Sequence, residues 1–337
     1  MPLCSRLTNL DPDPGTDATH ERGPEGLPLL LACLGWSNVD DWWNRWERVG
    51  GVHLARSEWS VPVLDRWIAF VALPLLSRVE SALHSGDRVL LGVSALPGCG
   101  KSTLCSWVKS ASEQLAWPVE HLSLDDFYWP GEQLEASMRG NPWSVPRALP
   151  GSHDIEELLQ SLNAWKTNGQ ITTPRFDKSL RNGRGDRAGN SRSQPQVVLI
   201  EGWFLGASPL PSIETEILQS LSDQELDWRA RAVSLLPRYQ EIWNLLDDLW
   251  HLRAVESNQS SRWKQEQLAT LEQQSGVGYR TSELADFNRM VLAALPPSWL
   301  RNLPQTSVVM DLNASRDVRE IHVKNTQLSA SSSSATG

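Results

Sequence analysis

The chain is poor in the residues that staple small secreted proteins and in the long apolar runs that anchor proteins in membranes. It has four Cys among 337 residues, and their positions match neither a metal-binding nor a disulfide pattern. The longest apolar runs, near residues 27–34 and 67–76, are too short to cross a bilayer. We therefore expect a protein of a reducing compartment, without a disulfide framework or a membrane span.

Positive charge is also scarce. The chain carries 31 Lys and Arg against 40 Asp and Glu, a formal net charge of −9, which argues against a general nucleic-acid binder. Residues 1–26 contain acidic side chains and no apolar core, so neither a secretory signal nor a transit peptide is expected, and the expected location is cytoplasmic. Tryptophan, in contrast, is abundant, with 17 residues.

Composition divides the chain into a main domain and flanking segments. Residues 1–26, rich in Pro, Gly and Asp, and the Ser-rich residues 326–337 are predicted to be disordered tails. Residues 27–84 are predicted to form a helical extension, with helical patterns at 27–49 and 60–82. The Trp cluster of this extension is more typical of packing than of a ligand cage. The main domain is expected over residues 85–325, with a helical insertion at about 215–300.

The strongest motif is GVSALPGCGKST at residues 92–103. An apolar run that predicts a buried strand precedes it, and a helical pattern over residues 101–115 follows, which is the context of a phosphate-binding loop. Backbone N–H groups and the helix N-terminus together favour a polyphosphate there. The residues predicted to bind the nucleotide are Ala95, which stands where the strict motif has Gly, and Gly98, Cys99, Gly100, Lys101, Ser102 and Thr103.

Acidic side chains follow two later strands. The predicted strand at residues 119–124 is followed by Asp125 and Asp126, and the apolar strand at residues 196–200 by Glu201. Ligands bind beyond the carboxyl ends of the strands in an open parallel sheet, so all three acids are candidates for site chemistry. The two Asp residues are equally typical of a turn. Glu201 lies where a second carboxylate directed at Mg²⁺ is expected, the alternative being a charge that emerges into solvent.

Residues 150–187 combine a capped helix with a basic segment. Asp154 and Glu157 predict a helix over residues 155–165, after a loop over 132–151, whereas capping leaves His153 unexplained. Residues 174–187 carry five cations and two acids. They are a flexible solvated loop, a cationic rim for an anionic substrate, or a nucleic-acid patch, which the lack of aromatic residues beyond Phe176 disfavours.

Residues 217–274 are predicted to be helical and Trp-rich, with a break at 257–261. After the break, Arg262 and Lys264 would belong to a mobile lid that closes over the site, as in small kinases, or to a plain amphipathic helix. A further helix around residues 284–291 and a strand around 306–312 complete the domain.

Together these motifs resemble the P-loop kinases of small metabolites, the group of uridine kinase, phosphoribulokinase and pantothenate kinase. The chain is most similar to the D-glycerate 3-kinase family of plants, fungi and cyanobacteria. Four stretches carry this similarity, SALPGCGKST at 94–103, SLDDFY at 123–128, PGSHD at 150–154 and FDKSLRNGRGDR at 176–187, with IEGW at 200–203 as a fifth. The chain departs from the family in having Leu96-Pro97 for the usual Pro-Gln and Lys264 for the usual Arg.

The resemblance implies a three-layer α/β/α P-loop fold with a mainly parallel sheet, and a kinase that uses ATP and Mg²⁺ to convert D-glycerate to 3-phospho-D-glycerate. It implies Asp125 as the base, Lys101 at the transferred phosphate, and Ser102 with Glu201 at the metal. The residues implied for the substrate are Asp126, Tyr128, His153, Asp154, Arg175, Lys178 and Arg187. The alternatives are a kinase for another small alcohol, such as a nucleoside or a pantoate derivative, and a regulatory P-loop ATPase without kinase activity. No nucleic-acid or membrane partner is expected.

Overall fold

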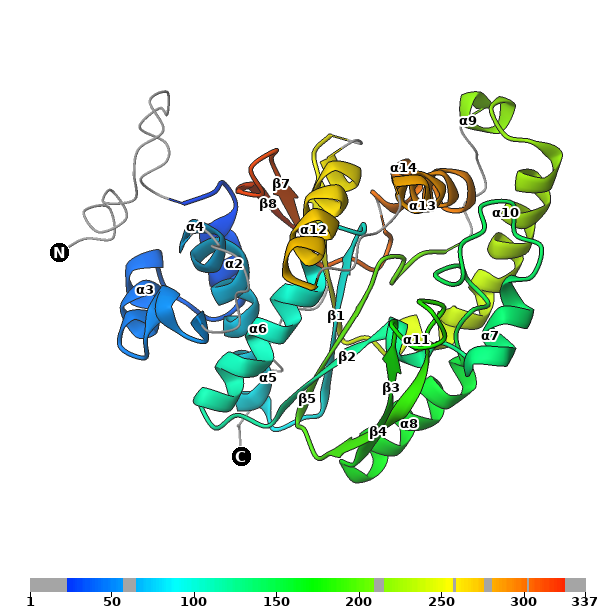
Figure 1. The fold of residues 1–337 in the computed structure, drawn as a ribbon. Helices are drawn as coiled ribbons and strands as arrows, with labels where there is room; N and C mark the ends of the chain where they lie inside the picture. Colours follow the sequence, from blue (N-terminus) through cyan, green and yellow to red (C-terminus); the bar gives the residue numbers. More distant parts are fainter. Residues whose placement is uncertain are drawn as a thin grey trace.

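A six-stranded sheet forms the centre of the computed structural model, which describes residues 23–56, 65–208, 215–256, 259–275, 281–301 and 303–324 (Figure 1). The strand order is β2-β5-β1-β6-β7-β8, and all neighbours are parallel except β7 and β8. The strands are β2 (Val119–Ser123), β5 (Val197–Gly202), β1 (Val89–Ala95), β6 (Asp248–Ala254), β7 (Val308–Leu312) and β8 (Val318–Val323). β1 and β5 are buried along their whole length, as expected for strands covered on both faces.

Helices cover both faces of the sheet, as the predicted three-layer fold requires. α5 (Leu73–Ser85) and α6 (Lys101–Gln114) pack on one face. α8 (Ile155–Asn168), α10 (Asp223–Leu235) and α11 (Gln240–Trp243) lie on the other side (Figure 1). α12 (Gln259–Ser275), α13 (Thr281–Ala294) and α14 (Pro297–Leu300) lie near the carboxyl ends of the strands, and α9 (Thr215–Gln219) precedes α10. None of the described helices has the length and hydropathy that a membrane crossing requires.

The Trp-rich extension is part of the core. It consists of α2 (Leu27–Cys33), α3 (Val39–Glu47), the 3₁₀ turn η2 (Gly51–His53), and α4 (Asp65–Trp67), which continues through the π-helical turn η4 (Ile68–Ala72) into α5. The indole N–H groups of Trp42 and Trp46 both donate to Ser77 Oγ of α5, at 2.7 and 2.9 Å. This arrangement confirms packing as the role of the Trp cluster, because Trp42, Trp43 and Trp46 are all buried in the core and two of the three indoles are also hydrogen-bonded.

The N-terminal tail was predicted to reach residue 26, and residues 1–22 lie outside the described part. Residues 23–26 are ordered, because the Glu25 carbonyl accepts the N–H of Ile321 at 2.8 Å and residue 25 forms a bridge to Glu320 of β8. The C-terminal tail prediction falls on residues that the structure does not describe.

Five elements differ from the sequence predictions. The expected loop over residues 132–151 begins with α7 (Gly131–Met138), and the basic segment belongs to an antiparallel hairpin of β3 (Ile171–Asp177) and β4 (Asp186–Ser193). β8 was also missed. The stretch 217–274 contains β6, so residues 215–300 are not one helical insertion: β6 pairs with β1 and β7 inside the central sheet. The Leu and Trp residues of β6 fit the periodicity of a helix and that of a strand equally well. Pairing with β1 and β7 makes this segment a strand.

Candidate active site

The phosphate loop connects β1 to α6 as predicted. α6 begins at Lys101, and Gly100 before it and Gly98 have φ angles of 86° and 91°, which side-chain-bearing residues seldom adopt. Lys101 Nζ lies 3.7 Å from Glu201 Oε2, so the lysine already faces the carboxyl edge of the sheet. The loop therefore presents backbone N–H groups, a helix N-terminus and a cation to one place.

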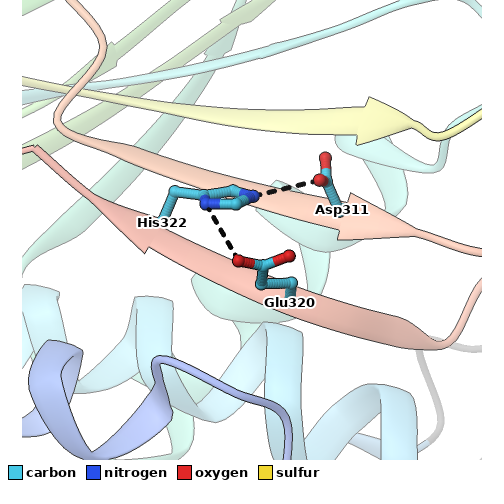
Figure 2. Close-up of side chains that lie close together, drawn as sticks. All are labelled: Asp311, Glu320 and His322. Atoms are coloured by element: carbon cyan, nitrogen blue, oxygen red, sulfur yellow. Dashed lines mark hydrogen bonds and ion pairs between the residues drawn. The ribbon is translucent and has the colours of Figure 1, made fainter.

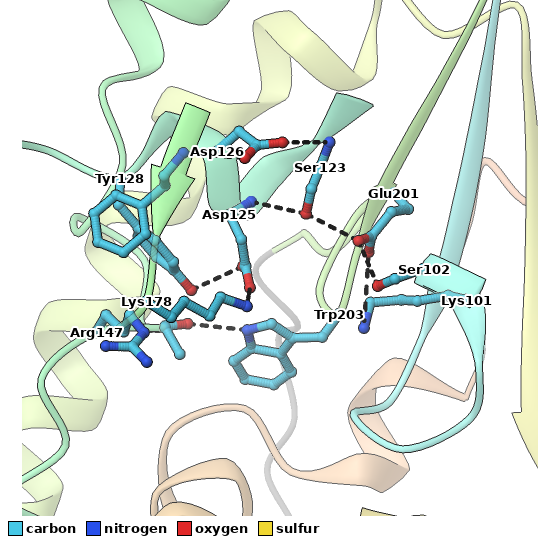
Figure 3. A network of polar contacts seen from close by, with 12 residues as sticks. Lys101, Ser102, Ser123, Asp125, Asp126, Tyr128, Arg147, Lys178, Glu201 and Trp203 are labelled. Atoms are coloured by element: carbon cyan, nitrogen blue, oxygen red, sulfur yellow. Dashed lines mark hydrogen bonds and ion pairs between the residues drawn. The ribbon is translucent and has the colours of Figure 1, made fainter. Parts of the chain in front are cut away.

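Glu201 is buried at the end of β5 and collects two hydroxyl groups. Ser102 Oγ donates to Glu201 Oε1 at 2.6 Å, and Ser123 Oγ donates to the same oxygen at 2.9 Å (Figure 3). Only 3% of Glu201 is exposed, so the alternative of a charge emerging into solvent is wrong. Hydroxyl and carboxylate oxygens are ligands that Mg²⁺ prefers, and the two residues predicted for the metal thus lie together with a fitting donor set.

Asp125 lies one strand away, in the 3₁₀ turn η5 (Leu124–Phe127) that follows β2. Its carboxylate accepts from Tyr128 OH at 2.8 Å and from Lys178 Nζ at 2.6 Å (Figure 3). Burial favours the neutral acid, but the charge and hydrogen bond of Lys178 and the charge of Lys101 outweigh it, so the pKa of Asp125 is well below its usual range. The carboxylate is therefore ionised at neutral pH.

The neighbouring Asp126 has a structural role. Its carboxylate accepts the N–H of Ser123, which closes the capping box of η5, and the N–H of Phe176 in β3 at 3.2 Å. Of the two interpretations of the acidic pair, the turn applies to Asp126 and the site chemistry to Asp125. Asp126 holds the turn and ties the hairpin to it, and Asp125 faces the phosphate loop.

His153 is buried behind Tyr128 instead of lying in a solvated loop. Its ring stacks on Tyr128 at 4.5 Å, and its Nδ1 lies 2.9 Å from Tyr239 OH. Tyr239 OH also accepts the N–H of Gly151 at 2.8 Å, and donation of its own proton to His153 Nδ1 would complete its hydrogen bonding, which corresponds to the tautomer with the proton on Nε2. Burial lowers the pKa of His153 to about 4, so the ring is neutral.

Asp154, Arg187 and Arg175 differ in how far contacts within the fold engage them, and Nη2 of Arg187 is buried without a hydrogen-bond partner among the described residues. Asp154 Oδ1 accepts the N–H of Glu157 at 3.0 Å, so capping accounts for it as predicted. Arg187 donates to the carbonyl of Tyr128 at 2.5 Å and pairs with Glu157 at 2.9 Å. Arg175 is exposed on β3. Of the three cations predicted for the substrate, the structure brings only Lys178 to Asp125.

One cation near Asp125 was missed by the sequence analysis. Arg147, in the irregular segment between α7 and α8, lies beside Lys178 and Tyr128 (Figure 3). No local pattern marks it, since its position depends on contacts with residues 183 and 184. Trp203, whose indole donates to the carbonyl of Ala148 at 2.9 Å, and Tyr239 were missed for the same reason.

The start of α12 lies on the phosphate loop. A Cβ placed on Gly98 would come within 2.6 Å of both Lys264 N and Ser260 O. Burial and the charges of Lys178 and Lys101 lower the pKa of Lys264 to about 8, so Lys264 belongs to the same cationic surroundings. Arg262 is directed elsewhere, because its Nη2 donates to the carbonyl of Ala314 in the turn between β7 and β8.

A second group of ionisable side chains lies in the other half of the sheet. His322 of β8 places one ring nitrogen 3.1 Å from Asp311 of β7 and the other 3.3 Å from Glu320 (Figure 2). Arg253 of β6 also holds Asp311, through two hydrogen bonds. These contacts join three neighbouring strands, and they are separate from the site around Asp125.

Comparisons with known proteins agree with this architecture. No model of a known protein family matches the chain. The uncharacterized kinase mug58 of Schizosaccharomyces pombe is 32% identical over 219 residues, which cover 60% of this chain and 78% of that protein. The chloroplastic D-glycerate 3-kinase of Arabidopsis thaliana is 30% identical over 232 residues, 64% of this chain and 49% of the relative.

A solved structure shows the same fold. The D-glycerate 3-kinase of Cryptococcus neoformans superposes with a TM-score of 0.59 at 18% identity, covering 85% of this chain and 100% of that one. Because the match to the Schizosaccharomyces pombe kinase covers 78% of that protein at 32% identity, the chain belongs to the family that these relatives share, the D-glycerate 3-kinase family of P-loop kinases.

Proposed function

We propose that this kinase transfers the γ-phosphoryl group of ATP to D-glycerate and releases 3-phospho-D-glycerate. The observation that carries the proposal is the position of Asp125, which faces the phosphate loop next to the Ser102–Glu201 pair and lies in a cationic environment that suits an anionic acceptor (Figure 3). Two relatives named D-glycerate 3-kinase support this acceptor. The position of the attacked hydroxyl follows from the names of these relatives.

In this proposal the protein positions groups and neutralises charge, which is most of what phosphoryl transfer requires. Lys101 and the N–H groups of the loop bind the β- and γ-phosphates. Ser102 and Glu201 would hold Mg²⁺, which neutralises charge on the phosphate oxygens when it is bound. The acceptor oxygen forms a bond to the γ-phosphorus, the bond from that phosphorus to the β–γ bridging oxygen breaks, and the hydroxyl proton passes to Asp125.

The low pKa of Asp125 limits what it does as a base. A carboxylate paired with Lys178 is a weak proton acceptor. Since the transition state of phosphoryl transfer is loose, the hydroxyl keeps its proton until bond formation is advanced. Asp125 therefore orients the hydroxyl first and accepts its proton late.

The test is the identity of the product. The protein is incubated with ATP, Mg²⁺ and D-glycerate, and the phosphorylated position is read by NMR, with uridine and pantothenate as parallel acceptors. Asp125→Asn is expected to lower kcat by roughly 10²- to 10⁴-fold with a modest change in the KM for ATP. Turnover of another alcohol alone would replace glycerate as the substrate, and ATP hydrolysis that no acceptor stimulates would indicate a regulatory ATPase. Near-normal kcat in Asp125→Asn would remove the proposed base.

A further inference from the structure

Arg147 is held in place from two sides although it lies in an irregular segment. Its Nη1 donates to the carbonyls of Gly183 and Arg184, at 2.9 and 3.0 Å, in the turn of the β3–β4 hairpin. The carbonyl of the next residue, Ala148, accepts the indole N–H of Trp203 at 2.9 Å. Ala148 also has a φ of 90°, a conformation that persists in a side-chain-bearing residue only where its surroundings impose it. The guanidinium is therefore preorganised.

Arg147 differs from the arginines around it in its partners. Arg181 and Arg184 both pair with Glu135, and Arg187 pairs with Glu157. Within the described part of the chain, no carboxylate lies within ion-pair distance of Arg147. A guanidinium has five N–H donors, and the two carbonyls use only those of Nη1. No described residue accepts from Nε or Nη2, so these N–H groups remain for a ligand.

The surroundings of the guanidinium favour an anionic ligand. Arg147 lies next to Lys178, whose Nζ reaches Asp125, and the two cations and the carboxylate follow one another across the site (Figure 3). Its charge acts on Lys178, Tyr128 and Lys264, all of which surround this space. Bidentate recognition of a carboxylate is the usual task of such a free guanidinium fork. A small hydroxy acid would thus place its hydroxyl at Asp125 and its carboxylate at Arg147.

We propose that Arg147 binds the carboxylate of the acceptor and makes the kinase select hydroxy acids over neutral alcohols. The inference rests on the proposed function, because it takes the acceptor to be D-glycerate. It replaces Arg175 and Arg187 as the cations for that carboxylate. Lys178 lies between the two ends of the substrate, where it contacts both the carboxylate and Asp125.

The experiment compares Arg147→Met with the wild-type kinase on D-glycerate and on its neutral analogues, D-glyceramide and glycerol. In the variant, kcat/KM for D-glycerate is expected to fall by roughly 10- to 150-fold, the effect of losing a charged hydrogen-bonding pair. The loss is expected mainly in KM, with KM for ATP and kcat/KM for glycerol within about twofold of wild type. Arg147→Lys keeps the charge without the fork, and we expect an intermediate loss.

The matched control is Arg192→Met, which removes an exposed arginine from β4 of the same hairpin and should leave all constants unchanged. Turnover of D-glycerate by the wild type is measured first, and its absence would overturn the proposed function. If the wild type phosphorylates D-glycerate and Arg147→Met keeps its KM, the role of Arg147 is overturned. An equal loss on glycerate and glycerol would also overturn it, since that indicates general damage. If Arg147→Met does not fold, Arg147→Lys decides by the same comparison.

Discussion

The close packing of α12 on the phosphate loop can be tested by replacing Gly98, because a side chain at this position would push α12 away. The change Gly98→Ala adds a Cβ that would lie 2.6 Å from Lys264 N and Ser260 O. Ordinary van der Waals contact of a Cβ begins at about 3.4 Å, so the start of α12 must move by about 0.8 Å. Gly100→Ala is a close control, because Gly100 has nearly the same φ, 86° against 91°, and its Cβ would meet only Trp67 at 3.8 Å.

The two variants share one cost and differ in the other. An alanine at positive φ costs about 1–2 kcal/mol in either place. Only Gly98→Ala also displaces α12, which is fastened by the buried Trp263 and its hydrogen bond to the carbonyl of Ala314 at 3.1 Å. Losing the burial of one large apolar side chain costs about 1.5–3 kcal/mol. That burial opposes undocking equally in both variants, whereas the 2.6 Å contacts raise the free energy of the docked state in Gly98→Ala alone. Overpacking of this kind costs about 1–3 kcal/mol. At about 1.4 kcal/mol or more, the undocked helix is at least about tenfold more populated in Gly98→Ala.

Limited trypsin digestion measures this population. Cleavage after Arg262 and Lys264 requires the start of α12 to leave the loop, and its rate follows the open population when reclosing is fast. We expect these two bonds to be cut at least about tenfold faster in Gly98→Ala than in Gly100→Ala, with fragments identified by mass spectrometry. Equal rates in the two variants would refute the packing of α12 against Gly98.

Three further predictions follow from the pKa shifts. Burial and the charge of Arg253 lower the pKa of His251 to about 4, so stability should fall by up to about 3 kcal/mol as pH drops from about 6.5 to 4. His251→Gln should flatten this loss in urea unfolding measured at pH 7 and pH 5. Burial raises the pKa of Cys99 to about 12, so iodoacetamide at pH 8 should label it only in denaturant, and rapid native labelling would contradict this. Lys178→Met should raise the pKa of Asp125 and move the acid limb of the kcat/KM profile to higher pH. An unchanged acid limb would show that Lys178 does not set the pKa of the group that limits activity.

The elements that could be predicted from sequence are those with local causes. The phosphate loop is one contiguous stretch whose backbone and helix N-terminus make the site, so its residues can be identified without knowing the fold. Glu201 could be placed because it ends an apolar run that is long enough to be a buried strand. Asp154 likewise caps a helix that begins at the next residue.

What could not be predicted depends on distant partners. The hairpin was open to interpretation as a flexible loop because the carboxylates that hold most of its arginines lie far away in the sequence. These carboxylates, Glu135 and Glu157, come from α7 and α8. The same holds for β6, whose register against β1 and β7 makes it a strand. No sequence pattern marks Arg147 as a site residue, because the two carbonyls that hold its side chain lie more than thirty positions away.

The hairpin therefore explains why the acceptor side of the site is ordered. It contributes the Phe176 N–H to Asp126, Lys178 to Asp125, and Asp186, whose carboxylate accepts the N–H of Gly131 at 2.8 Å. None of these contacts touches the phosphate loop. A substitution that loosens the hairpin should consequently disturb Asp125 and the acceptor before the nucleotide, and it should appear in kcat and in the KM for the acceptor while the KM for ATP is preserved.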